Sequence, residues 1–95
     1  MAELDEHIVA PARLKLMTTL TAVSEAEFAI VRDALEVSDS VLSKHLTALE
    51  DADYVKRRKG MLRGRRTTWI SLTPRGRDAL SGHVAALREL ISGID

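Results

Sequence analysis

The 95-residue chain carries no formal net charge, because 14 Lys and Arg residues balance 14 Asp and Glu residues. Its composition, 45% hydrophobic and 29% charged, is typical of a globular domain and argues against collagen-like, disordered and membrane-spanning classes. The absence of cysteine excludes disulfides, thiolate metal sites and a cysteine nucleophile. The acidic first residues, MAELDEHIVAPARL, lack the basic and apolar segments of a signal peptide, so we expect a cytoplasmic protein with no membrane partner.

Two helices are expected in the first third of the chain. Pro11 suits the first turn of a helix over residues 11–21. The apolar residues of this helix recur at helical spacing: Leu14, Met17 and Leu20, with Leu16 beside them. A second, shorter helix is expected to open near Ser24 and to end near Glu36. Its apolar residues repeat in the same way: Phe28, Val31 and Leu35.

A third helix, expected over residues 39–52, has two faces of different character. Ser38 precedes it and is suited to cap its first turn through the side-chain hydroxyl. At about 100° per residue one stripe is apolar: Leu42, Leu46 and Leu49. The opposite stripe is polar: Ser40, Lys44, Thr47 and Asp51, with Ser43 at its edge. The helix is therefore expected to bury one face and to present small polar residues on the other.

A β-hairpin is expected after the third helix. Two segments alternate β-branched or aromatic residues with polar ones and predict strands: residues 54–60 (YVKRRKG) and 65–73 (RRTTWISLT). Gly60 and Gly64 are expected in the tip that joins them. The inward positions of the second strand are expected to be Thr68, Ile70 and Leu72. This assignment places Trp69 on the opposite face of the hairpin.

A long final helix is expected over residues 74–94, because Thr73 supplies a cap and Pro74 suits the first helical position. Its apolar residues are spaced alternately four and three apart: Leu80, Val84, Leu87, Ile91 and Ile94. Such a heptad-like seam favours packing against another long helix. A domain of this size holds only a modest core, so we expect a homodimer formed through this helix. No repeat or linker interrupts the chain, which indicates a single domain over residues 1–95.

Positive charge is concentrated in residues 56–77, which hold nine of the 14 basic residues and no Asp or Glu. The nine are Lys56, Arg57, Arg58, Lys59, Arg63, Arg65, Arg66, Arg75 and Arg77. A folded protein that concentrates like charges commonly presents them to a polyanion. A solvated charged face or a basic localisation signal is the alternative.

The second and third helices, joined by a tight turn, form the pattern of a helix-turn-helix, whose second helix enters the major groove of DNA. Its small side chains permit close approach: Ser40, Ser43 and Thr47. Lys44 would reach a guanine edge or a phosphate. The hairpin would lie beside the phosphate backbone, with its arginine tip in the minor groove. The basic residues expected to contact double-stranded DNA there are Lys56, Arg58, Arg63, Arg65 and Arg66.

Three segments carry a family resemblance: APARLKLMTTL, EVSDSVLSKHLTALEDADYVKRRKG and GRRTTWISLTPRG. They are similar to the winged helix-turn-helix transcriptional regulators of the MarR- and ArsR-like group. The resemblance implies a mainly α fold with a small β-hairpin, in which a three-helix core carries a β-wing and a long C-terminal helix. It also implies a homodimer that binds pseudo-palindromic operators and regulates transcription, with repression expected. Residues that match recognition-helix positions are Ser40, Ser43, Lys44 and Thr47, and those that match the wing are Arg63, Arg65 and Arg66.

Three residues depart from the pattern of these regulators. Ile70 occupies a strand position where an aromatic residue is often found, with Trp69 beside it. Asp53 stands where glycine commonly follows the recognition helix, and aspartate adopts the left-handed backbone conformation less easily. Asp39 opens the third helix where a neutral polar residue is frequent. Its carboxylate favours the helix dipole but sits poorly near phosphate.

Neither an enzymatic centre nor a metal or cofactor site is expected. His45 borders the leucine stripe and is interpreted as a packed structural histidine. His7 and His83 lack a cysteine or a close group of further ligands. The acidic residues at the end of the third helix lack a nucleophile, an oriented base or a glycine-rich phosphate loop, so we interpret them as a solvated face.

The main alternative function is a winged-helix interaction module whose basic hairpin binds an acidic protein. The outward face of the third helix argues against it, because that face has no aromatic or Met anchor. The sequence leaves open the operator, the regulated genes, whether the protein represses or activates transcription, and whether a small-molecule effector exists and what it is.

Overall fold

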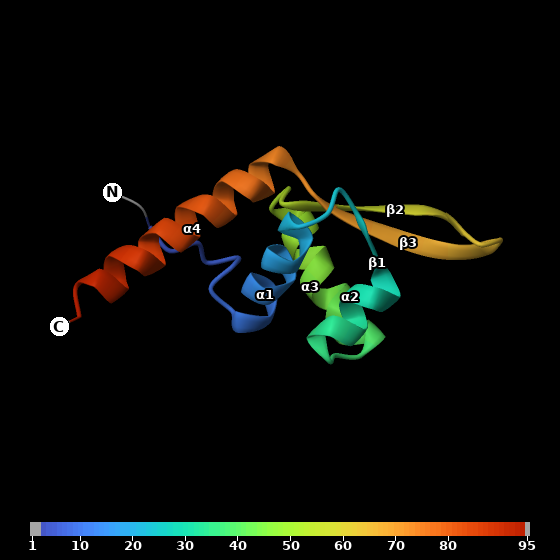
Figure 1. The fold of residues 1–95 in the computed structure, drawn as a ribbon, viewed down its shortest axis with the longest axis horizontal. Helices are drawn as coiled ribbons and strands as arrows, with labels where there is room; N and C mark the ends of the chain where they lie inside the picture. The colour runs from blue at the N-terminus through green and yellow to red at the C-terminus, as the bar shows by residue number, and fades with distance from the viewer. Residues whose placement is uncertain (1–2, 95) are drawn as a thin grey trace.

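Residues 3–94, which the computed structural model describes, form four helices and a small three-stranded sheet (Figure 1). In chain order the elements are α1 (Pro11–Thr21), β1 (Ala26–Glu27), α2 (Phe28–Leu35), α3 (Asp39–Asp51), β2 (Val55–Leu62), β3 (Arg65–Leu72) and α4 (Pro74–Ser92). The hairpin of β2 and β3 extends to one side of the first three helices, and α4 extends to the other. The expected fold class is confirmed: a three-helix core with a β-wing and a long C-terminal helix.

Helices α1, α2 and α3 close around a hydrophobic core that continues under the base of the sheet. The leucine stripe of α3 is fully buried, as expected: Leu42, Leu46 and Leu49. Helix α1 contributes Leu16, Met17 and Leu20, and β3 contributes Ile70 and Leu72. Because this apolar stripe fixes the rotation of α3 about its axis, the polar stripe of the helix must face outward.

The short strand β1 was not expected from the sequence. Ala26 pairs with Ile70 and Glu27 with Trp69, so β1 lies at the edge of the sheet, in the order β1-β3-β2. Helix α2 therefore begins at Phe28, and the expectation that it opens near Ser24 is wrong. The residues of β3 that pair with β1 lie more than 40 positions further along the chain, so no local sequence pattern predicts this strand.

The hairpin turns at Arg63 and Gly64, whose φ angles of 52° and 78° are both positive. Positive φ at both positions agrees with a two-residue type I′ turn, which matches the twist of the flanking strands. Gly60, also expected in the tip, instead lies inside β2 opposite Thr67. A Cβ there would come within 3.1 Å of the Trp69 ring, so this glycine leaves room for the tryptophan. Hydrophobic alternation alone could not separate the two glycines.

Asp53, which follows α3, adopts the left-handed conformation with a φ of 62°. Its N–H donates to the carbonyl of Glu50 at 2.9 Å, and the N–H of Tyr54 donates to the carbonyl of Leu49 at 2.8 Å. These bonds close the helix in the way that glycine commonly does at this position. The aspartate therefore preserves the junction between α3 and β2.

Helix α4 begins as expected, with Thr73 as its cap and Pro74 at its first position. The Oγ of Thr73 accepts a hydrogen bond from the N–H of Gly76 at 2.9 Å and donates one to the carbonyl of Asp53 at 2.6 Å. The first turn of α4 is therefore tied to the end of α3. Within residues 3–94 no helix has the length and apolar character needed to cross a membrane.

Candidate nucleic-acid interface

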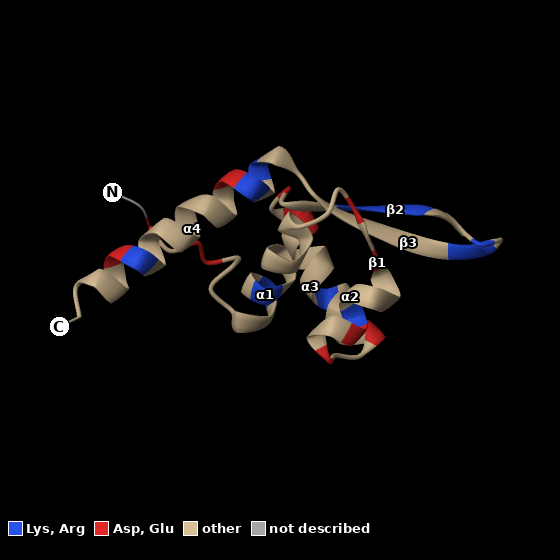
Figure 2. Cartoon of the chain, in the orientation of Figure 1, with Lys and Arg blue, Asp and Glu red and all other residues tan. Residues whose placement is uncertain are grey.

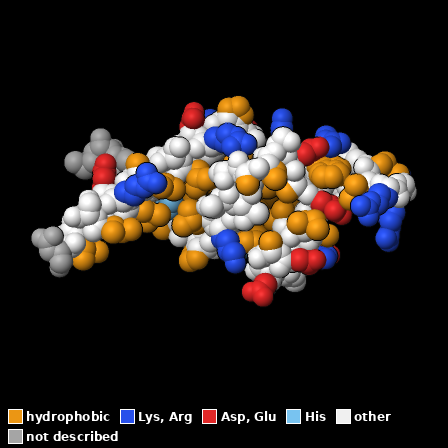
Figure 3. All heavy atoms as spheres, in the orientation of Figure 1, with side chains coloured by type: hydrophobic (Ala, Val, Ile, Leu, Met, Phe, Trp, Pro, Cys, Tyr) orange, Lys and Arg blue, Asp and Glu red, His pale blue; other side chains and the backbone are white. Residues whose placement is uncertain are grey.

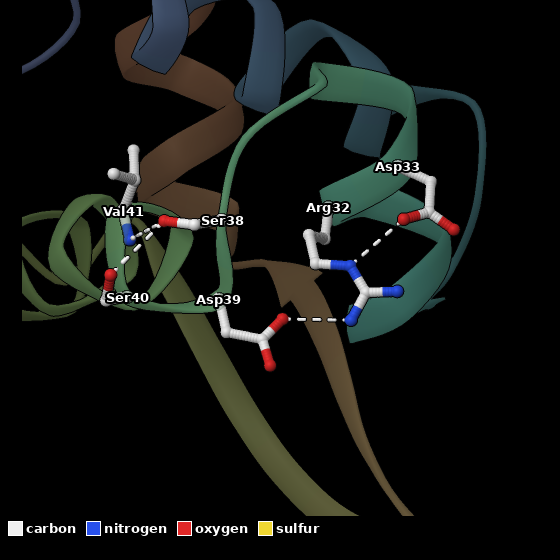
Figure 4. A network of polar contacts seen from close by, with 6 residues as sticks. All are labelled: Arg32, Asp33, Ser38, Asp39, Ser40 and Val41. Atoms are coloured by element: carbon white, nitrogen blue, oxygen red, sulfur yellow. Dashed lines mark hydrogen bonds and ion pairs between the residues drawn. The ribbon is translucent and has the colours of Figure 1, made fainter.

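The turn between α2 and α3 presents the N-terminal end of α3 to solvent. Glu36 ends α2 in the left-handed conformation, with a φ of 56°. Ser38 caps α3 as expected, because its Oγ accepts a hydrogen bond from the N–H of Val41 at 3.2 Å (Figure 4). The Oγ of Ser40 lies 3.2 Å from that of Ser38. Both hydroxyls are exposed at the end of the helix that would enter a groove.

The four residues expected to read DNA share the outward face of α3. Ser40, Lys44 and Thr47 are exposed, and Ser43 is half-buried. The hydroxyl of Thr47 accepts a hydrogen bond from Nη2 of Arg57 at 3.2 Å. The ammonium group of Lys44 makes no hydrogen bond or ion pair with any residue that the structure describes. The face combines small hydroxyls with one free ammonium group.

Arg57 joins the hairpin to α3. Its Nε donates to the Glu50 carboxylate at 2.8 Å and its Nη2 approaches the same oxygen at 2.5 Å. The bond to Thr47 adds a third link between β2 and the helix. The sequence placed Arg57 in the basic segment but gave no sign that it contacts the third helix. Which face of a strand meets a helix is decided by packing between distant segments.

The basic residues of β2 divide between the two faces of the hairpin. Arg57 and Lys59 lie on the face toward α3, opposite Ile70 and Thr68 of β3. Lys56 and Arg58 lie on the other face, because side chains alternate along a strand. The two expected contacts on β2 therefore point away from the outward face of α3.

Arg58 is held on that outer face by an acid and an aromatic ring. Its Nη2 and Nε donate to the Glu25 carboxylate at 2.6 and 3.3 Å. Its guanidinium also lies over the ring of Trp69, 5.9 Å from the centroid. The hydrogen bond to Glu25 raises the pKa of Arg58 above its ordinary value. The group is thus already paired, and it links the segment before β1 to the hairpin.

Arginines crowd the free end of the hairpin, where Figure 2 shows the blue segments farthest from the helices. Arg63, Arg65 and Arg66 are all exposed. None of the three guanidinium groups makes a hydrogen bond or ion pair with another residue among 3–94. In the space-filling view their end of the molecule is basic, while carboxylates lie over α2 and the turn before α3 (Figure 3). The tip is therefore a cluster of unneutralised positive charge held on a rigid arm.

A groove of about 420 Å³ separates the N-terminal half of α3 from the hairpin. Its walls are Phe28, Asp39, Ser43, Arg57, Lys59 and Thr68. Both signs of charge border it, with Asp39 on the helix and Lys59 on the strand. The polar face of α3 and the hairpin are therefore two sides of one surface.

His45 packs between α1 and α3, with its Nδ1 accepting a hydrogen bond from Nε of Arg13 at 3.2 Å. Burial, and secondarily Arg13, lower the pKa of this imidazole. His83 is buried in α4 and accepts from the N–H of Asp5 at 2.8 Å. Both histidines thus accept hydrogen bonds through Nδ1 within the fold. Among residues 3–94, no three His, Cys, Asp or Glu side chains converge as metal ligands would.

The apolar seam expected on α4 divides into two halves. Leu80 is buried in the core of the chain, and Val84 packs against that core. Leu87 is half-buried, whereas Ile91 and Ile94 are 65% and 75% exposed. The first part of the seam therefore packs within the chain, and the part that stays exposed lies toward the C-terminal end. Heptad spacing alone does not distinguish buried from exposed positions.

Comparison with known proteins points to the same kind of surface. A family model described as the winged helix DNA-binding domain matches residues 12–91. An uncharacterised protein of Methanocaldococcus jannaschii is 29% identical over 83 residues, which are 87% of this chain and 90% of that protein.

Solved structures extend the comparison to the fold. A transcriptional regulator homologue from Pyrococcus horikoshii superposes with a TM-score of 0.87 at 27% identity, over 96% of this chain and 91% of that one. A MarR-family transcriptional regulator from Enterococcus faecalis superposes with a TM-score of 0.73 at 23% identity, over 92% of this chain and 77% of that one. The second likeness, at this identity, shows a shared fold.

Proposed function

Because this chain belongs to the winged helix DNA-binding domain family, we propose that it is a cytoplasmic transcriptional regulator that binds double-stranded DNA sequence-specifically and represses transcription. The proposal rests on two features that the chain carries together. One is the small polar face of α3, and the other is the unneutralised arginine cluster at the hairpin tip. This pairing suits a binding protein rather than an enzyme.

In the proposed complex α3 lies in the major groove, with Lys44 as its main base contact. The hydroxyl residues beside it are Ser40, Ser43 and Thr47. The hairpin tip follows the backbone into the adjacent minor groove, where narrow segments concentrate negative potential. The tip contacts are Arg63, Arg65 and Arg66. We assign Lys59 and Arg57 to the groove beside α3, Lys56 to the flank of the hairpin, and Arg58 to the support of the wing through Glu25.

Replacing Lys44 with alanine is expected to weaken binding to the operator much more than binding to random DNA. A base contact is worth about 1–3 kcal/mol of discrimination, whereas a phosphate contact carries almost none. The operator is first isolated by sequencing the genomic fragments that the protein retains. Fluorescence anisotropy then compares affinities for the operator and for a random duplex of equal length at one salt concentration. Lys15→Ala, which removes an exposed lysine on α1, is the matched control and should leave the ratio unchanged.

Two results would revise this assignment. Equal weakening on operator and random DNA would make Lys44 a phosphate contact. No weakening on either would favour the alternative function, in which the basic hairpin binds an acidic protein.

We also propose that the chain forms a homodimer through the exposed part of the α4 seam. Ile91 and Ile94 are large apolar side chains left open to solvent on the same stripe as Leu87. A dimer would bury them, and two recognition helices would then meet half-sites about 34–36 Å apart on one face of the duplex. This spacing is the geometry that a pseudo-palindromic operator requires.

Replacing Ile91 with aspartate is expected to give a folded monomer. The side chain is 65% exposed in a single chain, so the fold does not depend on it, but a dimer would bury two facing carboxylates without partners. Sedimentation velocity measures the state of association, and circular dichroism reports the fold. Ser92→Asp, one position off the seam, is the control and should remain a dimer. A wild-type chain that sediments as a monomer at tens of micromolar concentration would contradict the dimer.

A further inference from the structure

Asp39, whose negative charge is unexpected beside DNA, is held in place by an arginine of the preceding helix. Nη1 of Arg32 donates to Oδ1 of Asp39 at 2.9 Å, across the turn between α2 and α3 (Figure 4). Nε of the same guanidinium donates to Oδ1 of Asp33 at 3.0 Å. Oδ2 of Asp39 accepts no hydrogen bond from any residue among 3–94, and the side chain is 70% exposed. One carboxylate oxygen is therefore fixed and the other is free.

Arg32 forms two ion pairs. The carboxylates of Asp33 and Asp39 contact its guanidinium group through different nitrogens, and only 32% of the arginine side chain is exposed. The hydrogen bond to Asp39, and next the one to Asp33, raise the pKa of Arg32 above its ordinary value. The bond from Nη1 of Arg32 therefore places Oδ1 of Asp39 beside α2 and leaves Oδ2 on the solvent side.

Asp39 lies at the end of α3 that helix-turn-helix proteins use to contact base edges. Asp39 and Ser43 are one turn apart on α3, and both line the groove that faces Lys59 of the hairpin. Asp39 thus lies at the edge of the face that carries Ser43 and Lys44. Its free oxygen is an acceptor on the surface proposed to meet DNA.

We propose that Asp39 determines specificity by accepting, through Oδ2, a hydrogen bond from the N4 amino group of a cytosine in the major groove, and that Arg32 is its positioning residue. This inference rests on the proposed DNA-binding function. An ionised carboxylate only accepts hydrogen bonds. Guanine presents two acceptors in the major groove, and thymine presents an acceptor and a methyl group. Adenine offers a donor, but the adjacent N7 acceptor faces the carboxylate unfavourably, which leaves cytosine as the best partner.

The charge of this cluster adds a second effect. Asp33 and Asp39 together exceed Arg32 by one negative charge, so the cluster repels phosphates at any sequence. Only DNA that places a donor opposite Oδ2 offsets this repulsion. Asp39 should therefore weaken binding to random DNA and strengthen binding to the operator. A phosphate contact would strengthen binding to both.

The test compares wild-type protein with Asp39→Asn in a selection from a pool of random duplexes. Asparagine pairs with both N6 and N7 of adenine, so the preference at one position in each half-site should change from cytosine to adenine. Discrimination for cytosine there should fall by about five- to tenfold, while affinity for a random duplex rises. The matched control is Asp51→Asn, which removes the same charge at the other end of α3 from an exposed aspartate. This control should leave every base preference unchanged.

Arg32 is tested by the same selection. Arg32→Gln should lose the cytosine preference at that one position and keep the rest of the motif. Arg32→Lys, which retains the charge, should restore part of the preference. If Arg32 had a purely structural role, its replacement would weaken the base preference at every position of the motif and lower the melting temperature. That result would overturn the positioning role.

Each further outcome has a distinct meaning. If Asp39→Asn selects the same cytosine as wild type, the inference is overturned and Asp39 serves the helix dipole only. Equal gains on random DNA for Asp39→Asn and Asp51→Asn, without a change of motif, would reduce the effect to charge alone and overturn the base contact. A wild-type protein that enriches no sequence would overturn the proposed function itself, and this inference with it.

Discussion

Replacing Gly76 with alanine is expected to lower the free energy of unfolding by about 3 kcal/mol, at the upper end of the cost of overpacking a tight site. A Cβ at this position would lie 2.1 Å from the carbonyl oxygen of Tyr54 and 2.8 Å from its carbonyl carbon. Both are backbone atoms, so no side-chain rotation relieves the clash. For a domain of this size the loss corresponds to a fall in melting temperature of roughly 12–24 °C.

The backbone around Gly76 has little freedom to move away. The N–H of Thr73 donates to that same Tyr54 carbonyl at 3.0 Å, and the Thr73 side chain bonds both Asp53 and Gly76. Shifting α4 outward would break these bonds at the junction of α3 and β2. The close approach therefore positions the hairpin and α4 relative to α3.

Gly82→Ala provides a matched control in the same helix. No atom lies within 4 Å of the Cβ that this change would add. Alanine should therefore stabilise the protein by about 0.5–1 kcal/mol through its higher helix propensity. Thermal and urea unfolding of both variants measure the two effects, which should have opposite signs. Equal melting temperatures for the two variants would mean that the contact between Gly76 and Tyr54 is looser than the structure indicates.

Removing the three arginines of the hairpin tip is expected to reduce DNA affinity by roughly 10²–10³-fold at 0.1 M salt, because each neutralised phosphate releases about 0.9 counterion. The variant combines Arg65→Ala and Arg66→Ala with Arg63→Asn. Asparagine is chosen for Arg63 because it tolerates the positive φ of 52° at that position. The slope of log K against log salt should become shallower by about 2–3 units.

Specific and random duplexes should weaken alike in this variant, because phosphates carry no sequence information. Titrations of both duplexes over a range of salt concentrations measure the slopes. Arg88→Ala, which removes an exposed charge from the far part of α4, is the control and should leave the slope unchanged. Unchanged slopes in the tip variant would move the polyanion contact to another surface.

Local signals in the sequence were sufficient for the starts of α1, α3 and α4 and for the two faces of α3, but not for the start of α2. Pro11, Ser38 and Thr73 each act on backbone groups within a few residues, so the helices begin where these residues predict. The leucine stripe of α3 likewise follows from helical periodicity, and burying it determines which face remains outside. The polar face proposed to read DNA was therefore accessible from the sequence alone.

Contacts between distant segments decided the rest. Strand β1 pairs with the edge of β3, and a Cβ at Gly60 would meet the side chains of Arg58 and Trp69. Alternation along β2 predicts two faces, but only packing against α3 selects Arg57 for that helix and leaves Arg58 to Glu25.

Two further assignments depend on the tertiary structure for the same reason. Arg32 and Asp39 are seven residues apart and lie on different helices. The turn between these helices brings their side chains together. The α4 seam repeats regularly in sequence, yet Leu80 meets the core of its own chain and Ile91 does not. Periodicity predicts which side chains of a helix share an apolar face. It does not predict what covers that face, because the covering segments are distant in sequence and become adjacent only after folding.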